Sequence, residues 1–108
     1  MAQKVLGQSA PAAATLTALY TVPASKYAVV SSITVCNRSA ASTVFRVSVA
    51  VAGAADDSKQ YLYYDLNIPG NDTFIATVGI TLAATDVVRV YATLATLSFS
   101  LFGTEETV

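Results

Sequence analysis

The chain has 108 residues, of which 54% are hydrophobic and only 12% charged, and its formal net charge is −1. It contains no histidine, no tryptophan and a single cysteine, Cys36. A zinc site needs several histidine or cysteine ligands, and nucleophilic catalysis usually relies on a histidine base, so the composition argues against both chemistries. One cysteine also cannot form a disulfide within the chain.

The distribution of charge argues against nucleic acid and membranes as partners. The six basic residues are spread along the whole chain, at Lys4, Lys26, Arg38, Arg46, Lys59 and Arg89. Nucleic-acid-binding proteins instead cluster such residues to follow the phosphate backbone. No apolar run approaches the ~20 residues that cross a bilayer, and the N-terminus lacks the pattern of a signal peptide. We therefore expect a soluble protein, made in the cytoplasm, that binds neither nucleic acid nor membrane.

The first 14 residues differ in character from the rest of the chain. Gly7, Pro11 and the alanines at positions 12–14 interrupt any regular pattern, so residues 1–14 are predicted to form an extended N-terminal arm. We expect this arm to cross onto a neighbouring subunit. Residues 15–108 are predicted to form a single domain.

From residue 15 onward, apolar and small polar residues alternate with a period of two, which is typical of half-buried β-strands. The predicted strands cover residues 15–22, 27–36, 45–51, 61–68, 74–82, 88–92 and 97–101. Turn-forming residues separate them, most clearly Pro69-Gly70-Asn71-Asp72. The ten-residue spacing and the absence of a helical period predict an antiparallel β-sandwich of about seven to eight strands, either jelly-roll or immunoglobulin-like.

Several large apolar side chains fall on strand positions opposite the predicted core. In residues 61–68, the pattern places Tyr64 with the core and turns Tyr61 and Tyr63 outward. Aromatic side chains anchor protein interfaces, and a large exposed apolar patch indicates a contact surface. We therefore predict a homo-oligomer, and the candidate interface residues are Tyr61, Tyr63, Ile75, Val87, Tyr91 and Phe102. Outward tyrosines can also stack on sugars, so a glycan is a possible ligand, or they can simply cover a sheet.

The carboxylates and the cysteine offer weak candidates for chemistry. Asp56-Asp57-Ser58 is the only local calcium candidate, but it lacks the spacing of a calcium loop. Asp72 and Asp86 lie in turn sequences, where aspartate caps its own backbone. Cys36 fits a small buried hydrophobic position. We expect no catalytic residue, no metal and no cofactor.

Five segments of the chain resemble stretches of a known group of proteins. They are residues 19–24 (LYTVPA), 35–38 (VCNR), 61–65 (YLYYD), 71–74 (NDTF) and 79–87 (GITLAATDV). They are similar to segments of small virion structural proteins of tailed bacteriophages, and the resemblance extends from about Leu6 to Gly103.

The resemblance implies a non-enzymatic role in a virion, with synthesis in the host cytoplasm. Such proteins decorate and cement capsids, often as trimers, or they belong to tails and fibres. The implied partners are further copies of the chain, with a trimer favoured, and other virion proteins such as the major capsid protein. We expect a capsid decoration protein; a tail, baseplate or fibre module is one alternative, and a carbohydrate-binding module is another.

Overall fold

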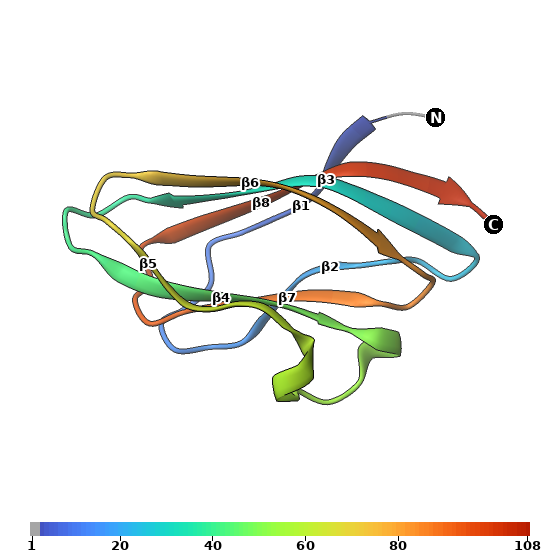
Figure 1. The fold of residues 1–108 in the computed structure, drawn as a ribbon, viewed down its shortest axis with the longest axis horizontal. Helices are drawn as coiled ribbons and strands as arrows, with labels where there is room; N and C mark the ends of the chain where they lie inside the picture. The colour runs from blue at the N-terminus through green and yellow to red at the C-terminus, as the bar shows by residue number, and fades with distance from the viewer. Residues whose placement is uncertain (1–2) are drawn as a thin grey trace.

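The alternating sequence forms two antiparallel β-sheets that pack face to face in the computed structural model, which describes residues 3–108 (Figure 1). The strands are β1 (Gln3–Ser9), β2 (Thr17–Thr21), β3 (Lys26–Asn37), β4 (Thr43–Ala50), β5 (Tyr61–Ile68), β6 (Thr73–Leu82), β7 (Val87–Ala92) and β8 (Leu97–Thr107). Two short 3₁₀ turns, η1 (Val51–Gly53) and η2 (Ser58–Gln60), lie between β4 and β5. No helix of the described residues is long and apolar enough to cross a membrane.

The strand order identifies the topology. Sheet 1 has the order β1-β8-β3-β6 and sheet 2 has the order β2-β7-β4-β5. The antiparallel pairs β1/β8, β2/β7, β3/β6 and β4/β5 are those of one long hairpin rolled into two layers. This is an eight-stranded jelly roll. The predicted antiparallel β-sandwich is therefore confirmed, and of the two predicted topologies the chain adopts the jelly roll.

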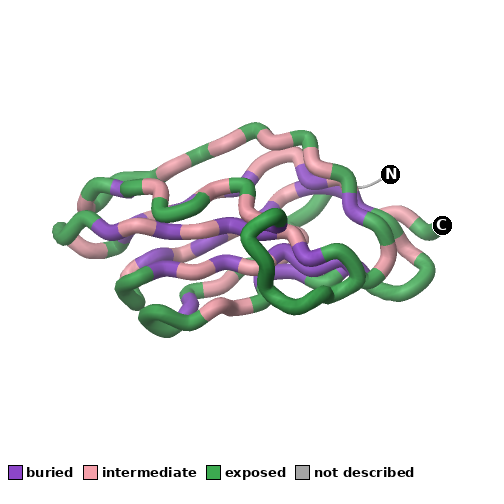
Figure 2. The backbone as a smooth tube through the Cα atoms, turned by 60° about the horizontal axis from the view of Figure 1, so that its bottom comes forward, coloured by how far each residue is buried: buried purple, intermediate pink, exposed green. Residues whose placement is uncertain are grey.

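The hydrophobic core lies between the two sheets and draws side chains from both. Its largest fully buried apolar side chains are Val22, Val30, Val35, Phe45, Val47, Ile68, Val88, Val90, Leu97, Phe99 and Leu101. Phe45 of sheet 2 is completely buried, and its ring lies 5.4 Å from that of Phe74 and 6.1 Å from that of Phe99, both in sheet 1. Figure 2 shows buried positions along the strands of both sheets and exposed connections between them.

The N-terminal segment is part of the sandwich, so the predicted arm is wrong for the residues that the structure describes. Residues 3–9 form β1 and pair with β8, from Gln3 opposite Thr104 to Ser9 opposite Phe99. Leu6 packs against the core. A Cβ on Gly7 would lie 2.2 Å from the carbonyl oxygen of Leu19, so glycine here lets β1 approach β2 closely. Residues 1–2 of the predicted arm lie outside the described residues.

Candidate functional site

The outer face of sheet 2 carries a cluster built around a β-bulge. Phe45 pairs with Leu66 and Val47 pairs with Tyr63, so Arg46 alone faces two residues of β5, Tyr64 and Asp65. Asp65 accommodates the extra residue with φ 53°, in the left-handed region that aspartate tolerates better than most residues. The bulge therefore brings two consecutive side chains of β5 to one arginine.

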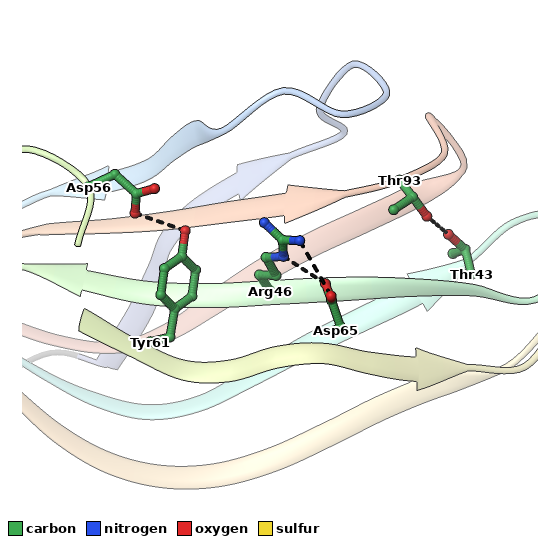
Figure 3. A network of polar contacts seen from close by, with 6 residues as sticks. All are labelled: Thr43, Arg46, Asp56, Tyr61, Asp65 and Thr93. Carbon is green, nitrogen blue, oxygen red and sulfur yellow. Dashed lines mark hydrogen bonds and ion pairs between the residues drawn. The ribbon is translucent and has the colours of Figure 1, made fainter. Parts of the chain in front are cut away.

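Three side chains contact the guanidinium of Arg46, those of Asp65, Tyr64 and Tyr91. Its Nε donates a 2.6 Å hydrogen bond to Oδ1 of Asp65, and this contact raises the pKa of Arg46 above its ordinary value (Figure 3). Its Cζ lies 4.2 Å from the ring centroid of Tyr64 and 4.4 Å from that of Tyr91 on β7. Both contacts are cation–π interactions, which Arg makes readily because its guanidinium is planar and weakly hydrated.

Tyr61 extends this arrangement towards the loop between β4 and β5. Its ring meets that of Tyr64 edge to face at 5.1 Å. Its hydroxyl donates a 2.8 Å hydrogen bond to Asp56, as Figure 3 shows. Burial, and then the contact with Asp56, raise the pKa of Tyr61 above its ordinary value. We call Arg46, Tyr61, Tyr64, Asp65 and Tyr91 the outer cluster. Tyr64 is its most exposed aromatic member, at 60%.

The loop of residues 51–60 covers the part of this face next to the outer cluster. Asp86 accepts hydrogen bonds from the backbone N–H groups of Ala52 and Ala83, both at 2.9 Å, and so joins the loop to the β6–β7 turn. Arg89 donates to the carbonyl oxygens of Ala54 and Gly53, at 2.8 and 3.3 Å. The loop is thereby tied to β7, and the outer cluster lies beside it on the open part of the face.

The structure does not bring the six predicted interface residues together. Tyr61 and Tyr91 belong to the outer cluster, whereas Ile75 and Phe102 lie on the outer face of sheet 1. Sheets 1 and 2 form opposite layers of the sandwich, so the predicted residues cannot form one patch.

Two of the six predicted interface residues are not available on the outer surface. Tyr63 packs against the core, because the bulge at Tyr64 and Asp65 shifts the alternation of β5 by one residue. Val87 is only 8% exposed, and it lies beside Gly53 of η1. The same bulge explains why Tyr64, predicted to face the core, is exposed on the outer face.

Sequence reasoning missed Arg46, Tyr64 and Asp65 as a unit. The sequence contained one signal for the bulge, because Asp65 is the one charged residue of this strand. Aspartate is uncommon within strands and is enriched at left-handed backbone positions.

The carboxylates considered for catalysis or calcium serve local structure. Asp57 accepts a hydrogen bond from the N–H of Lys59 and caps η2, Asp72 accepts one from the N–H of Thr73, and Asp86 holds the loop. Within residues 3–108, no three histidine, cysteine or acidic side chains gather closely enough to hold a metal ion. Cys36 is half-buried on β3.

Comparison of the chain with protein-family models, with curated proteins and with solved structures finds no match. The candidate site therefore rests on its own geometry. The outer cluster offers tyrosine rings and a planar cation fixed by mutual contacts, with its charges paired as Arg46 and Asp65. Such an arrangement suits recognition of another surface, because little side-chain freedom remains to be lost on binding.

Proposed function

We propose that the protein is a non-enzymatic virion structural protein, acting as a capsid decoration protein that stabilises the head by noncovalent contacts. The observation that carries the proposal is the strand order, because the jelly roll is a recurrent architecture of viral capsid domains. The resemblance to small virion proteins of tailed bacteriophages points the same way. Fold alone does not determine function, so the proposal depends on the contact surface as well.

In this proposal the outer cluster is the surface that meets the major capsid protein. Tyrosine and arginine are, with tryptophan, the residues enriched among those that dominate interface energies. Tyr64 is exposed while Arg46 and Asp65 restrain it and its neighbours, so the surface is formed before contact. Many copies on one shell multiply a modest contact into a large collective stabilisation.

The test is binding of purified protein to heads that lack it, measured by co-sedimentation. We expect Tyr64→Ala or Arg46→Ala to reduce occupancy at least tenfold. Tyr27→Ala is the matched control, because Tyr27 is another exposed tyrosine, on β3 of sheet 1. Equal occupancy for Tyr64→Ala and Tyr27→Ala would contradict the role of the outer cluster. Antibody labelling that finds the protein on tails would instead favour the tail, baseplate or fibre alternative.

A carbohydrate-binding module is the second candidate, and one observation favours it. Tyr64 presents an exposed ring beside the polar groups of Arg46 and Asp65, and jelly rolls also occur in lectins. A glycan array read with the wild type and Tyr64→Ala separates the two functions. Signal that Tyr64→Ala abolishes supports glycan binding, and an array without signal removes it.

A further inference from the structure

Strand β6 forms an edge of sheet 1, and its first half, residues 73–77, lacks the usual protection against pairing with another strand. Its ten residues, TFIATVGITL, include neither a charged side chain nor a proline. The other edge strands differ, since β1 carries Lys4, β2 has only five residues, and β5 contains Asp65 and two register shifts. Natural proteins protect exposed edges with charge, proline, bulges or short strands, because the free backbone groups of an edge can bind another strand.

The first half of β6 is also regular enough to accept a partner strand. Residues Thr73 to Thr77 pair without interruption with β3, from Cys36 opposite Thr73 to Ser32 opposite Thr77. The register shift comes only beyond this segment, at Val78 and Gly79. Ile75 lies at the middle of the regular segment and is 67% exposed.

The core is least covered along the side of the sandwich formed by β5 and β6. Eight partly buried apolar side chains pack against the core, and six of them belong to these two strands. The six are Tyr63, Leu66, Phe74, Ala76, Val78 and Ile80. An added strand beside β6 would shield the members on β6 from water, and each apolar Å² removed from water stabilises by ~25 cal/mol.

We propose that two copies of this chain associate through their β6 edges, antiparallel about a twofold axis near Ile75, so that their sheets 1 form one continuous eight-stranded sheet. The partner strand is assigned to a second copy of this chain for two reasons. A twofold axis places the β6 strands of the two copies antiparallel to each other. Because β6 has no charged side chain, pairing it with its own copy brings no like charges together. With the axis at Ile75, Thr73 of one copy lies opposite Thr77 of the other, so the two strands overlap over residues 73–77. Five residues at about 3.3 Å each give a paired length of roughly 17 Å.

The contact does not depend on the virion role and is tested on the purified full chain. By analytical ultracentrifugation, we expect the wild type to show a monomer–dimer equilibrium and Ile75→Lys to weaken dimerisation at least tenfold. Ile75 points away from the core, so the variant retains its fold, which circular dichroism verifies. Val51→Lys is the matched control, because Val51 is 69% exposed on η1 and should leave the equilibrium unchanged.

A cross-linking experiment tests the position of the axis. Cys36 lies near Ile75 across the β3/β6 pair, so it is first replaced by serine. In this background Ile75→Cys should form a disulfide-linked dimer on mild oxidation, because directly opposed strand residues have Cβ atoms ~5 Å apart, whereas Val51→Cys should not. A wild type that stays monomeric at millimolar concentration overturns the proposal, as does a trimer or other oligomer that Ile75→Lys leaves intact.

Discussion

Asp65 acts in the outer cluster through its backbone as well as its charge. Its left-handed conformation forms the bulge, and its carboxylate pairs with Arg46. Asparagine tolerates this conformation, so Asp65→Asn should cost at most about 1 kcal/mol, as expected for an exposed ion pair. Valine does not tolerate it, so Asp65→Val should cost about 1–2 kcal/mol more. Urea unfolding at pH 7 measures both, and equal losses would show that the bulge is not held by this residue.

A second residue-scale prediction concerns Tyr20 and Glu105, which connect the two sheets. The Tyr20 hydroxyl donates a 2.5 Å hydrogen bond to Oε2 of Glu105 and lowers the pKa of Glu105 below its ordinary 4.5, and Lys4 lowers it further. Burial, followed by this contact, raises the pKa of Tyr20 above its ordinary 10.0. Glu105 therefore stabilises the fold above pH 4.5, and this contribution is lost as pH falls through its lowered pKa. The Tyr20 contribution is present below pH 10.0 and is lost as pH rises above that value.

The two losses of stability are separable by mutation. The free energy of unfolding should fall less between pH 6 and pH 3 in Glu105→Gln than in the wild type. Between pH 9 and pH 11 it should fall less in Tyr20→Phe than in the wild type. Urea titrations followed by circular dichroism give these values. If the free energy of unfolding changed with pH in both variants as it does in the wild type, the contact between Tyr20 and Glu105 would not be the source of the pH dependence.

At the scale of elements, β1 differs most from its prediction, because it pairs with β8 of its own domain and does not form an arm. Because a Cβ at Gly7 would meet the carbonyl oxygen of Leu19, Gly7→Ala should push β1 away from β2 and cost about 1–3 kcal/mol. Gln8→Ala is the control, since Gln8 is exposed and its side chain only donates to Ser100. Thermal unfolding compares the two variants. A Gly7→Ala variant as stable as Gln8→Ala would indicate that β1 adds little to the domain and would restore the arm hypothesis.

Seven of the eight strands were predictable from the sequence, the exception being β1, but the face on which each side chain lies was not always predictable. Alternation located β3, β4 and β5, because a half-buried strand needs a period of two. A bulge adds one residue without changing composition, so it reversed the predicted faces of Tyr63 and Tyr64. Sheet order depends on contacts distant in sequence, which is why the six predicted interface residues could not be assigned to one sheet or the other.

At the scale of the whole molecule, the two sheets present different surfaces. Sheet 2 exposes a cluster of aromatic and charged residues, in which Arg46 and Asp65 are paired. Sheet 1 ends in the uncharged edge strand β6. If both proposals hold, self-association and attachment to a shell use different layers of one sandwich. A subunit could then make both contacts at once, because neither surface includes a residue of the other.

The outer cluster and the β6 edge both depend on the contacts of Phe45 with Phe74 and Phe99, which join the two sheets. Phe45 contacts Phe74 and Phe99 across the core and is fully buried, so Phe45→Ala should cost about 3–5 kcal/mol. That is a large part of the ~5–15 kcal/mol that stabilises a typical domain. Phe102→Ala makes the same change on the outer face of sheet 1, where the side chain is only half-buried, and should cost less than half as much. Urea midpoints compare the two variants, and similar losses would mean that the sheets are held together by contacts other than this cluster.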